Sequence, residues 1–291
     1  MKVLNFGSLN LDHFYEVEHI VRPGETISSG KYRLACGGKG LNQSVALAHA
    51  GAQVFHAGKV GQDGEALLAC LKAAGVDTRY VEVTEEAPSG HAIIQVDKGG
   101  QNSIIIHGGA NREIQKADVS RVLEDFGPGD WLLLQNEVSC IPEMIEQAKK
   151  QGLTIALNPS PMDEHIATYP LEKVDYFIIN EIEGRELSGA SEPQAMLTAM
   201  RDRFPKAATL LTLGEQGVLY ADRQIRLAVP AEKVRAVDTT AAGDTLTGFF
   251  IAQKLAGQPT KDCLRTACHA AVICVTRRGA ADSIPWLKEV L

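Results

Sequence analysis

The stretch D-T-T-A-A-G-D-T-L-T-G, residues 238–248, decides the predicted fold and function. Small residues at 241–243 allow the backbone to turn tightly and bring its N–H groups close to a ligand. The apolar spacing of residues 245–255 predicts a helix directly after this turn. Free N–H groups at the start of a helix form an anion site that suits phosphate. Asp244 adds a carboxylate in the first helical turn, beside that predicted anion.

This carboxylate can be explained in two ways. In an ordinary capped helix, Asp244 would only complement the positive end of the helix dipole. Next to a transferring phosphoryl group, Asp244 would serve as a base. An isolated stretch of this kind does not decide between the two explanations, so the rest of the chain has to.

Length and composition are those of an ordinary globular protein. The chain has 291 residues, of which 45% are hydrophobic and 22% charged, enough for one large α/β domain or two small ones. The net charge of −7 argues against a nucleic acid or an anionic membrane as the main partner. Residues 1–7 are typical of a first strand and not of a secretion signal, and no apolar run approaches the roughly 18 residues of a membrane span.

Cysteine usage predicts a reducing compartment. No C-x-x-C pair and no ligand-like spacing with histidine occurs in the chain. We therefore expect buried, reduced thiols in a cytoplasmic protein, and no zinc site. The six cysteines are Cys36, Cys70, Cys140, Cys263, Cys268 and Cys274.

Strand-like and helix-like segments alternate along most of the chain. Buried strands are predicted at 54–60, 131–134, 154–157 and 176–179, each followed by a turn or helix pattern. This alternation predicts a three-layer α/β fold, with a mostly parallel central sheet and helices on both faces. Polar residues follow several strands, where open α/β sheets bind ligands. They occur at 10–12, 135–137, 158–161 and 180–183.

Two segments do not follow this alternation of strands and helices. Residues 13–34 contain short alternating pieces separated by Pro and Gly, and residues 90–107 contain a hairpin signal at Lys98-Gly99-Gly100. We expect these β insertions, about 12–34 and 90–107, to pair with each other as a small β-sheet lid. The lid would cover a single domain that spans residues 1–291.

A glycine-rich run, Gly37-Gly38-Lys39-Gly40, lies between the two insertions and precedes Asn42 and Gln43. Its glycines allow the backbone to pass close to a ligand. The run matches neither the P-loop pattern G-x-x-x-x-G-K-[ST] nor the dinucleotide fingerprint G-x-G-x-x-G. A nicotinamide-dependent dehydrogenase therefore has little support.

The ordered set of motifs resembles the ribokinase group of the phosphofructokinase-B-type sugar kinase family, over nearly the whole chain. Thr240 and Cys274 depart from the residues that are common in this group, but both positions would act through backbone carbonyls. The motifs are Asn10-x-Asp12, Gly37-Gly38-Lys39-Gly40-x-Asn42-Gln43, Gln135-x-Glu137, Asn158-Pro159-x-Pro161, Asn180-Glu181-x-Glu183, Thr212-Leu213-Gly214-x-x-Gly217, Asp238-Thr239-x-Ala241-Ala242-Gly243-Asp244-Thr245, Val275-Thr276-Arg277-x-Gly279-Ala280 and Ser283-Ile284-Pro285-Trp286.

The resemblance implies an ATP-dependent kinase that phosphorylates the primary hydroxyl of D-ribose and releases ADP. Asp244 would be the base, and Ala241, Ala242 and Gly243 would form the anion hole. The implied sugar-binding residues are Asn10, Asp12, Gly38, Lys39, Asn42, Glu137 and Asp244. The implied ATP contacts are Asn180, Thr212, Gly214, Gly217 and Gly243, with Glu183 organising the hydration shell of Mg²⁺. The implied K⁺ ligands are the side chains of Asp238 and Ser283 and the carbonyls of Thr240, Cys274, Arg277 and Gly279.

Alternatives stay open at this point. The nearest is another kinase of the same family, acting on a nucleoside, fructose or a keto-deoxy sugar. A non-catalytic sugar-binding regulator would be expected to lack the base or the glycine-rich hole, yet Asp244 and Gly243 are both present.

Two further expectations concern partners and the nucleotide base. The family implies a homodimer formed through the lid, with Ile93, Ile104 and Ile106 either on an exposed apolar face or buried within the lid. His269 is a weak candidate for a contact with adenine, and a core histidine is the favoured interpretation.

Overall fold

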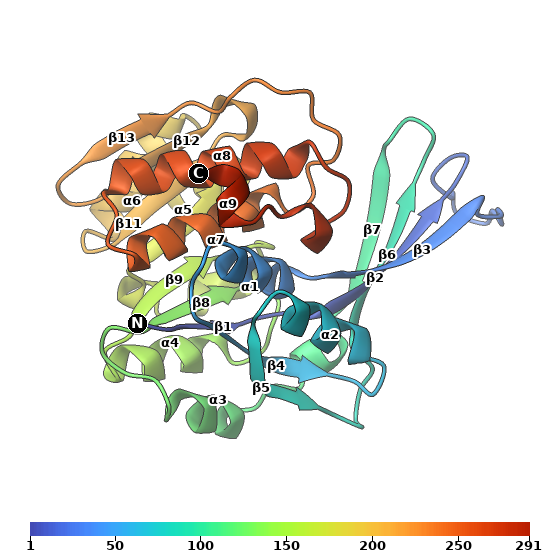
Figure 1. The fold of residues 1–291 in the computed structure, drawn as a ribbon, viewed down its shortest axis with the longest axis horizontal. Helices are drawn as coiled ribbons and strands as arrows, with labels where there is room; N and C mark the ends of the chain where they lie inside the picture. Colours follow the sequence, from blue (N-terminus) through green and yellow to red (C-terminus); the bar gives the residue numbers. More distant parts are fainter.

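The computed structural model describes residues 1–291 and is built on a nine-stranded sheet (Figure 1). From β11 to β5 neighbouring strands pair parallel, and β12 and β13 add an antiparallel edge. Across the sheet the order is β13 (Arg226–Val229), β12 (Val218–Ala221), β11 (Ala208–Thr212), β10 (Tyr176–Asn180), β9 (Thr154–Asn158), β8 (Trp131–Gln135), β1 (Val3–Phe6), β4 (Val54–Val60) and β5 (Asp77–Val83).

Helices cover both faces of this sheet (Figure 1). One face packs against α1 (Lys39–His49), α2 (Glu65–Ala73), α7 (Ala242–Leu255) and α8 (Thr260–Val275). The other packs against α3 (Lys116–Leu123), α4 (Ile141–Lys150), α5 (Glu181–Ser188) and α6 (Pro193–Arg203). The chain ends in α9 (Leu287–Val290), and short 3₁₀ helices span Gly109–Arg112, Glu164–Thr168, Leu171–Lys173, Gly214–Gln216 and Ala281–Ser283.

Successive strand residues alternate between two apolar cores. Leu133 packs into the core beneath α1 and α7, whereas Leu132 and Leu134 pack into the core beneath α3 and α4. Strands buried on both faces need near-continuous apolar runs, which is the pattern that the sequence shows. The predicted fold class is confirmed.

Four elements of the main body, β5, α3, α6 and the short α9, were not predicted. Strand β5 is an edge strand whose residues are only partly buried or exposed, so it carries no continuous apolar run. Helices α3 and α6 do not follow a strand directly, so the alternation of strands and helices did not predict them.

A second sheet of four strands projects from one side of the body (Figure 1). Its order is β3 (Lys31–Gly37), β2 (Asn10–Glu16), β6 (Gly90–Val96) and β7 (Asn102–His107). The central strands β2 and β6 pair in parallel, and each outer pair is antiparallel. The two β insertions therefore pair with each other, as the sequence predicts.

The isoleucines of this small sheet do not share one face. Ile93 lies opposite Ile105 in the β6–β7 pairing, whereas Ile104 lies opposite Ile94. Since side chains alternate along a strand, Ile93 points away from the face that carries Ile104 and Ile106. The three are 39%, 51% and 55% exposed, so the predicted common face and the predicted burial are both wrong.

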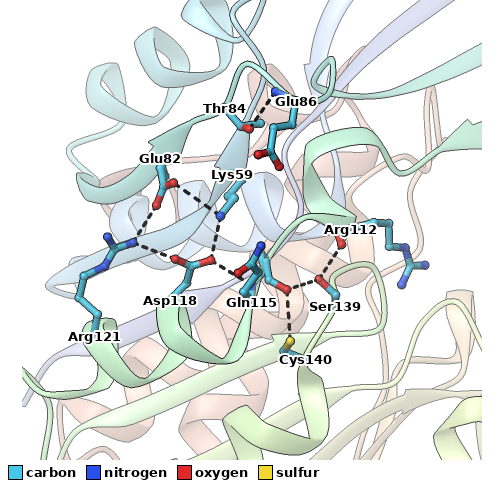
Figure 2. A network of polar contacts seen from close by, with 11 residues as sticks. Lys59, Glu82, Thr84, Glu86, Arg112, Gln115, Asp118, Arg121, Ser139 and Cys140 are labelled. Carbon is cyan, nitrogen blue, oxygen red and sulfur yellow. Dashed lines mark hydrogen bonds and ion pairs between the residues drawn. The ribbon is translucent and has the colours of Figure 1, made fainter.

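A polar network fixes α3 to the edge of the main sheet (Figure 2). Lys59 on β4 is only 8% exposed, and its Nζ lies 2.8 Å from Asp118 Oδ2 and 3.5 Å from Glu82 Oε1. Arg121 closes the network at 2.7 Å from Glu82 and 3.1 Å from Asp118. A buried ammonium ion needs such partners, because an uncompensated buried charge is strongly destabilising.

All six cysteines are free thiols. Cys36, Cys70 and Cys140 are only partly buried, so the prediction that every cysteine is buried is wrong for these three. Cys36 and Cys70 lie at the margin of the core, where β3 meets α2. None of the helices has both the length and the apolar character needed to cross a bilayer.

Candidate functional site

Asp244 lies in the first turn of α7, as the sequence predicts, and is 8% exposed. Ala241 precedes the helix in the left-handed conformation (φ 60°), which is strained for a residue with a side chain. This turn aims the helix start into the site. The first turn of a helix leaves the N–H groups of Gly243 and Asp244 without an intrahelical acceptor.

Two amide side chains of α1 hold the Asp244 carboxylate. Asn42 Nδ2 donates to Asp244 Oδ2 at 3.1 Å, and Gln43 Nε2 donates to Asp244 Oδ1 at 2.8 Å. Both amides are buried. Each carboxylate oxygen therefore has a fixed donor, and the direction of its remaining lone pairs is set by α1.

Gln43 is itself held by a chain of buried amides. Its Nε2 also donates to Asn158 Oδ1 at 3.1 Å, and its Oε1 accepts from Gln135 Nε2 at 2.7 Å. Gln135 Nε2 in turn donates to Asn5 Oδ1 at 2.9 Å. Gln43, Gln135 and Asn158 belong to the motifs in the sequence, but no role was predicted for them. The signal for Gln135 and Asn158 was their position as the last residues of β8 and β9.

Two clefts meet at Asp244. The larger, of about 760 Å³, extends beneath the small sheet and is lined by Asn10, Asp12 and Glu137 among others. The smaller, of about 210 Å³, is lined by Asn180, Glu183 and Thr212, and by Ala241 to Gly243. Lys39, Ala241 and Asp244 line both clefts. The two clefts therefore adjoin at Lys39, Ala241 and Asp244.

The larger cleft brings together the predicted sugar-binding residues Asn10, Asp12, Gly38, Lys39, Asn42, Glu137 and Asp244. Asn10 Oδ1 accepts a hydrogen bond from Asn111 Nδ2 at 2.8 Å. Glu137 accepts from the hydroxyl of Ser8 and from the N–H of Lys39, the latter at 3.0 Å. Ser8, Asn111 and Arg33, which also lines this cleft, were not predicted as site residues.

Burial changes the acid–base properties of this cleft. Desolvation, together with the nearby charge of Glu137, raises the pKa of Asp12 to about 7, although Arg33 opposes the shift. Desolvation also raises the pKa of Glu137, against the charge of Lys39 and the hydrogen bond from Ser8. Burial alone would lower the pKa of Lys39, but the carboxylates of Asp244, Glu137 and Glu183 raise it above its ordinary value. Lys39 is therefore a permanent cation between the two clefts.

The glycines at 37 and 38 are required because neighbouring atoms leave no room for a side chain. A Cβ at Gly37 would lie 2.0 Å from the carboxylate of Asp12. Gly38 has φ 92°, and a Cβ there would lie 3.1 Å from the backbone of Ser8 and Asn10. A larger residue at Gly37 would displace the Asp12 side chain from the cleft, and one at Gly38 would be strained by the positive φ and would press on the Ser8 and Asn10 backbone.

The smaller cleft is shaped by the start of α5. Asn180 caps this helix by accepting from the N–H groups of Ile182 and Glu183, each at 2.9 Å. The Glu183 carboxylate accepts from the backbone and side-chain nitrogens of Asn180, both at 2.9 Å. Glu183 is 4% exposed and lines the cleft, so its charge faces whatever occupies that space.

The predicted nucleotide contacts divide between two places. Thr212 lines the smaller cleft at the end of β11, whereas Gly214 and Gly217 lie in the following turn, outside the lining of both clefts. A Cβ at Gly217 would lie 2.1 Å from the carbonyl oxygen of Val229. Val229 lines a further cavity of about 370 Å³, together with Cys268 and His269.

His269 is not a core histidine, which corrects the favoured interpretation of the sequence. Its side chain is 38% exposed, and its Nδ1 lies 3.0 Å from Glu232 Oε1 at the 370 Å³ cavity.

The predicted cation ligands form one cluster between the start of α7 and the end of α8. Asp238 accepts from the N–H and hydroxyl of Thr240 and from the N–H of Gly279, at 3.0, 2.6 and 3.1 Å. Burial raises the pKa of Asp238, but these hydrogen bonds hold it below its ordinary value. Cys274 Sγ lies 3.0 Å from Ser283 Oγ, and the Cys274 carbonyl accepts from the N–H of Arg277 at 3.0 Å.

Comparison with known proteins places this site in a described family. The family model "pfkB family carbohydrate kinase" matches residues 1–287. The chain is 36% identical to a ribokinase of Staphylococcus aureus, over 99% of this chain and 98% of that protein. It is 32% identical to a deoxyribokinase of Salmonella typhi, over 99% of this chain and 97% of that protein.

A solved structure has the same fold over the whole chain. The Arabidopsis thaliana ribokinase complexed with ribose and ATP superposes with a TM-score of 0.90 at 31% identity, covering 99% of this chain and 97% of that one. The matched family model, the full-length relatives and this superposition agree with one another. The chain belongs to the pfkB family of carbohydrate kinases.

Proposed function

We propose that the protein is an ATP-dependent ribokinase, which phosphorylates the primary hydroxyl of D-ribose to give ribose 5-phosphate and ADP. The observation that carries this proposal is the Asp244 carboxylate at the junction of two clefts, next to the unpaired N–H groups at the start of α7. A carboxylate that only complements the helix dipole would repel an anion bound at the same place. The carboxylate is needed there when an alcohol must be aimed at a phosphoryl group.

In this proposal the sugar occupies the larger cleft and the terminal phosphate of ATP the smaller one. Asp244 accepts a hydrogen bond from the primary hydroxyl and takes its proton as the phosphoryl group is transferred. The N–H groups of Gly243 and Asp244 stabilise the negative charge on the transferred group. The N–H of Ala242, also predicted for the anion hole, donates to the Thr239 carbonyl at 3.3 Å. Lys39 lines both clefts and adds a cation near this charge.

Recognition of the sugar rests on the carboxylates and amides of the larger cleft, the side chains of Asn10, Asp12, Asn42 and Glu137. Carboxylates and amides pair with vicinal hydroxyls. A buried polar pocket rejects an analogue that lacks a hydroxyl, because one of its groups then stays unpaired. We therefore place ribose ahead of 2-deoxyribose. The deoxyribokinase relative keeps 2-deoxyribose as the second candidate substrate.

A coupled ADP-release assay with purified protein tests the substrate. Ribose should give the highest kcat/KM among ribose, 2-deoxyribose, fructose, adenosine and a keto-deoxy sugar acid. A higher value for 2-deoxyribose would make the protein a deoxyribokinase. Absence of turnover with every sugar would instead favour a sugar-binding regulator.

The smaller cleft fits a hydrated Mg²⁺ ion that accompanies ATP. Glu183 presents a buried carboxylate to this cleft, and each oxygen has a lone pair beyond its bond to Asn180. Mg²⁺ retains several of its waters in proteins, and such a carboxylate can accept hydrogen bonds from them. The ion would neutralise charge on the phosphates.

The Asp238 cluster fits a monovalent cation such as K⁺. Its donors are oxygens, one carboxylate and otherwise neutral hydroxyl and carbonyl groups, from Asp238, Thr240, Cys274, Arg277, Gly279 and Ser283. The buried hydroxyl of Thr245 also lies close to Cys274. A bound cation would hold the turn at Ala241 and thereby the anion site. Turnover should be higher in potassium than in sodium buffer, and equal rates would contradict this site.

We further propose that the small sheet acts as a lid and as the contact between two copies of the chain. The face with Ile104 and Ile106 is exposed and continuous with the larger cleft, so a second sheet could cover it. Sedimentation of the wild type and of Ile104→Lys tests this contact. A monomeric wild type would contradict it. Because ATP is the co-substrate, we place the reaction in the cytoplasm.

A further inference from the structure

Two cysteines that the proposed reaction does not use face each other where the small sheet joins the main body. Cys36 lies near the end of β3, and Cys70 lies on α2. Cys36 Sγ contacts the carbonyl oxygen of Ala66 at 3.5 Å. Ala66 lies one helical turn before Cys70, and a side chain at i+4 leans back over residue i on the same helical face. The Cys36 side chain therefore lies next to the Cys70 side chain, where β3 packs against α2.

The surroundings of the two thiols allow them to react with an oxidant. Both cysteines are only partly buried at the margin of the apolar core, and neither lines a cleft of the catalytic site. The Cys70 thiol forms a hydrogen bond that lowers the pKa of Cys36, whereas that same bond raises the pKa of Cys70. Cys36 is thus the better nucleophile, since the thiolate is the reactive form.

We propose that Cys36 and Cys70 form a reversible disulfide that links β3 to α2 when the thiol pool becomes oxidised. The Cys36 thiolate attacks one sulfur of a low-molecular-weight disulfide such as oxidised glutathione and releases one glutathione thiol. The Cys70 sulfur then attacks the mixed disulfide at Cys36 and releases the second glutathione. Two electrons and two protons pass from the protein to oxidised glutathione, and two reduced glutathiones result.

The position of this bond connects it with the sugar site. In the β2–β3 pairing Cys36 lies opposite Leu11, the residue between Asn10 and Asp12. Gly37, Gly38 and Lys39 follow directly after Cys36. A covalent bond to α2 would fix the base of the small sheet at the point from which it extends over the larger cleft. If the sheet moves to admit the sugar, this bond would restrict that movement.

Peptide mapping tests the bond itself, independently of the reaction. The full-length protein is incubated with oxidised glutathione, alkylated and digested without reduction. The expected product joins the Cys36 peptide to the Cys70 peptide, with two thiols lost per chain and recovered after treatment with dithiothreitol. Cys140→Ser, which alters the third partly buried cysteine, should behave as the wild type. Reduced cysteines, separate glutathione adducts or a bond between two chains would overturn the proposal.

A kinetic measurement tests the consequence, which rests on the proposed function. Oxidation should lower kcat/KM for ribose by about tenfold, within the roughly 10²-fold that a small misplacement of substrate-binding groups can cost. The loss should appear in the wild type and Cys140→Ser, be reversed by dithiothreitol, and be absent from Cys36→Ser and Cys70→Ser. Equal rates before and after oxidation would refute control of the sugar site. If no sugar is turned over, the proposed function fails, while peptide mapping still decides whether the pair forms.

Discussion

Asp244→Asn separates the role of the carboxylate from its contribution to the fold. The change removes the base but keeps the size and shape of the side chain. The new carboxamide has one oxygen and one NH₂ group. The oxygen can accept from only one of the two amides that donate to Asp244, so the NH₂ group of the other, Asn42 or Gln43, would face the new NH₂ group. The Oδ1 atom of Asn42 is buried and has no partner. A rotation of the Asn42 amide would turn this oxygen toward the new NH₂ group and restore the hydrogen bond.

The structure therefore predicts a large effect on turnover and a small effect on stability. Loss of a general base lowers kcat by roughly 10²–10⁴, which corresponds to about 2.7–5.5 kcal/mol in the barrier. One exchanged hydrogen bond changes the free energy of unfolding by about 1 kcal/mol. The rotated Asn42 amide pairs its buried oxygen with the new NH₂ group, so no two donors face each other. We therefore expect the free energy of unfolding to fall by no more than about 1 kcal/mol.

Initial rates by coupled ADP release, together with urea unfolding of the same preparations, measure both quantities. Asp244→Ala provides the comparison, since it also abolishes the contacts to Asn42 and Gln43. A kcat of Asp244→Asn within tenfold of the wild type, for a folded protein, would refute the role of Asp244 as the base.

Three further predictions address the surroundings of the site. Gln43→Ala should lower kcat about tenfold and leave KM for ribose nearly unchanged, because Gln43 orients Asp244; an unchanged kcat in the ADP-release assay would contradict this. Burial raises the pKa of Asp12 to about 7, so the carboxylate that binds hydroxyls is largely protonated below that pH. kcat/KM for ribose should therefore rise between about pH 6 and pH 8 and level off above it, whereas Asp12→Asn should have a lower value and no such rise; the same rise in the variant would assign it to another group. Lys59→Ala should lower the free energy of unfolding in urea by about 1–3 kcal/mol, since it leaves the partly buried Asp118 and Glu82 carboxylates with one partner fewer. Lys98→Ala, at an exposed ion pair, should lower the free energy of unfolding by clearly less, and equal losses would contradict a special role for the Lys59 network.

The main architecture could be predicted because it depends on local patterns. Strands such as β8 and β10 are apolar runs with polar residues at their ends, and the helices that follow them have a clear period. The chirality of βαβ connections then leaves few arrangements of a parallel sheet. Edge elements such as β5 are half exposed and mixed in composition, so their sequence carries no comparable signal.

Residues named by the motifs were found close together, but the contacts that position them were not predictable. The donors to Asp244 lie about two hundred residues earlier, since the Gln43–Asp244 bond spans 201 positions. Such pairing is decided by how α1 packs against α7, which no local pattern reports. The same limit applies to the Ile93 side chain, because the hairpin register alone decides its face. It also applies to the contact between Cys36 and Cys70.

A structure of the protein with ribose and a non-hydrolysable ATP analogue tests the central claim most directly. We predict that the primary hydroxyl of ribose lies within hydrogen-bonding distance of Asp244, with the terminal phosphate at the N–H groups that begin α7. Ribose bound outside the larger cleft, or a terminal phosphate far from Gly243, would contradict the account.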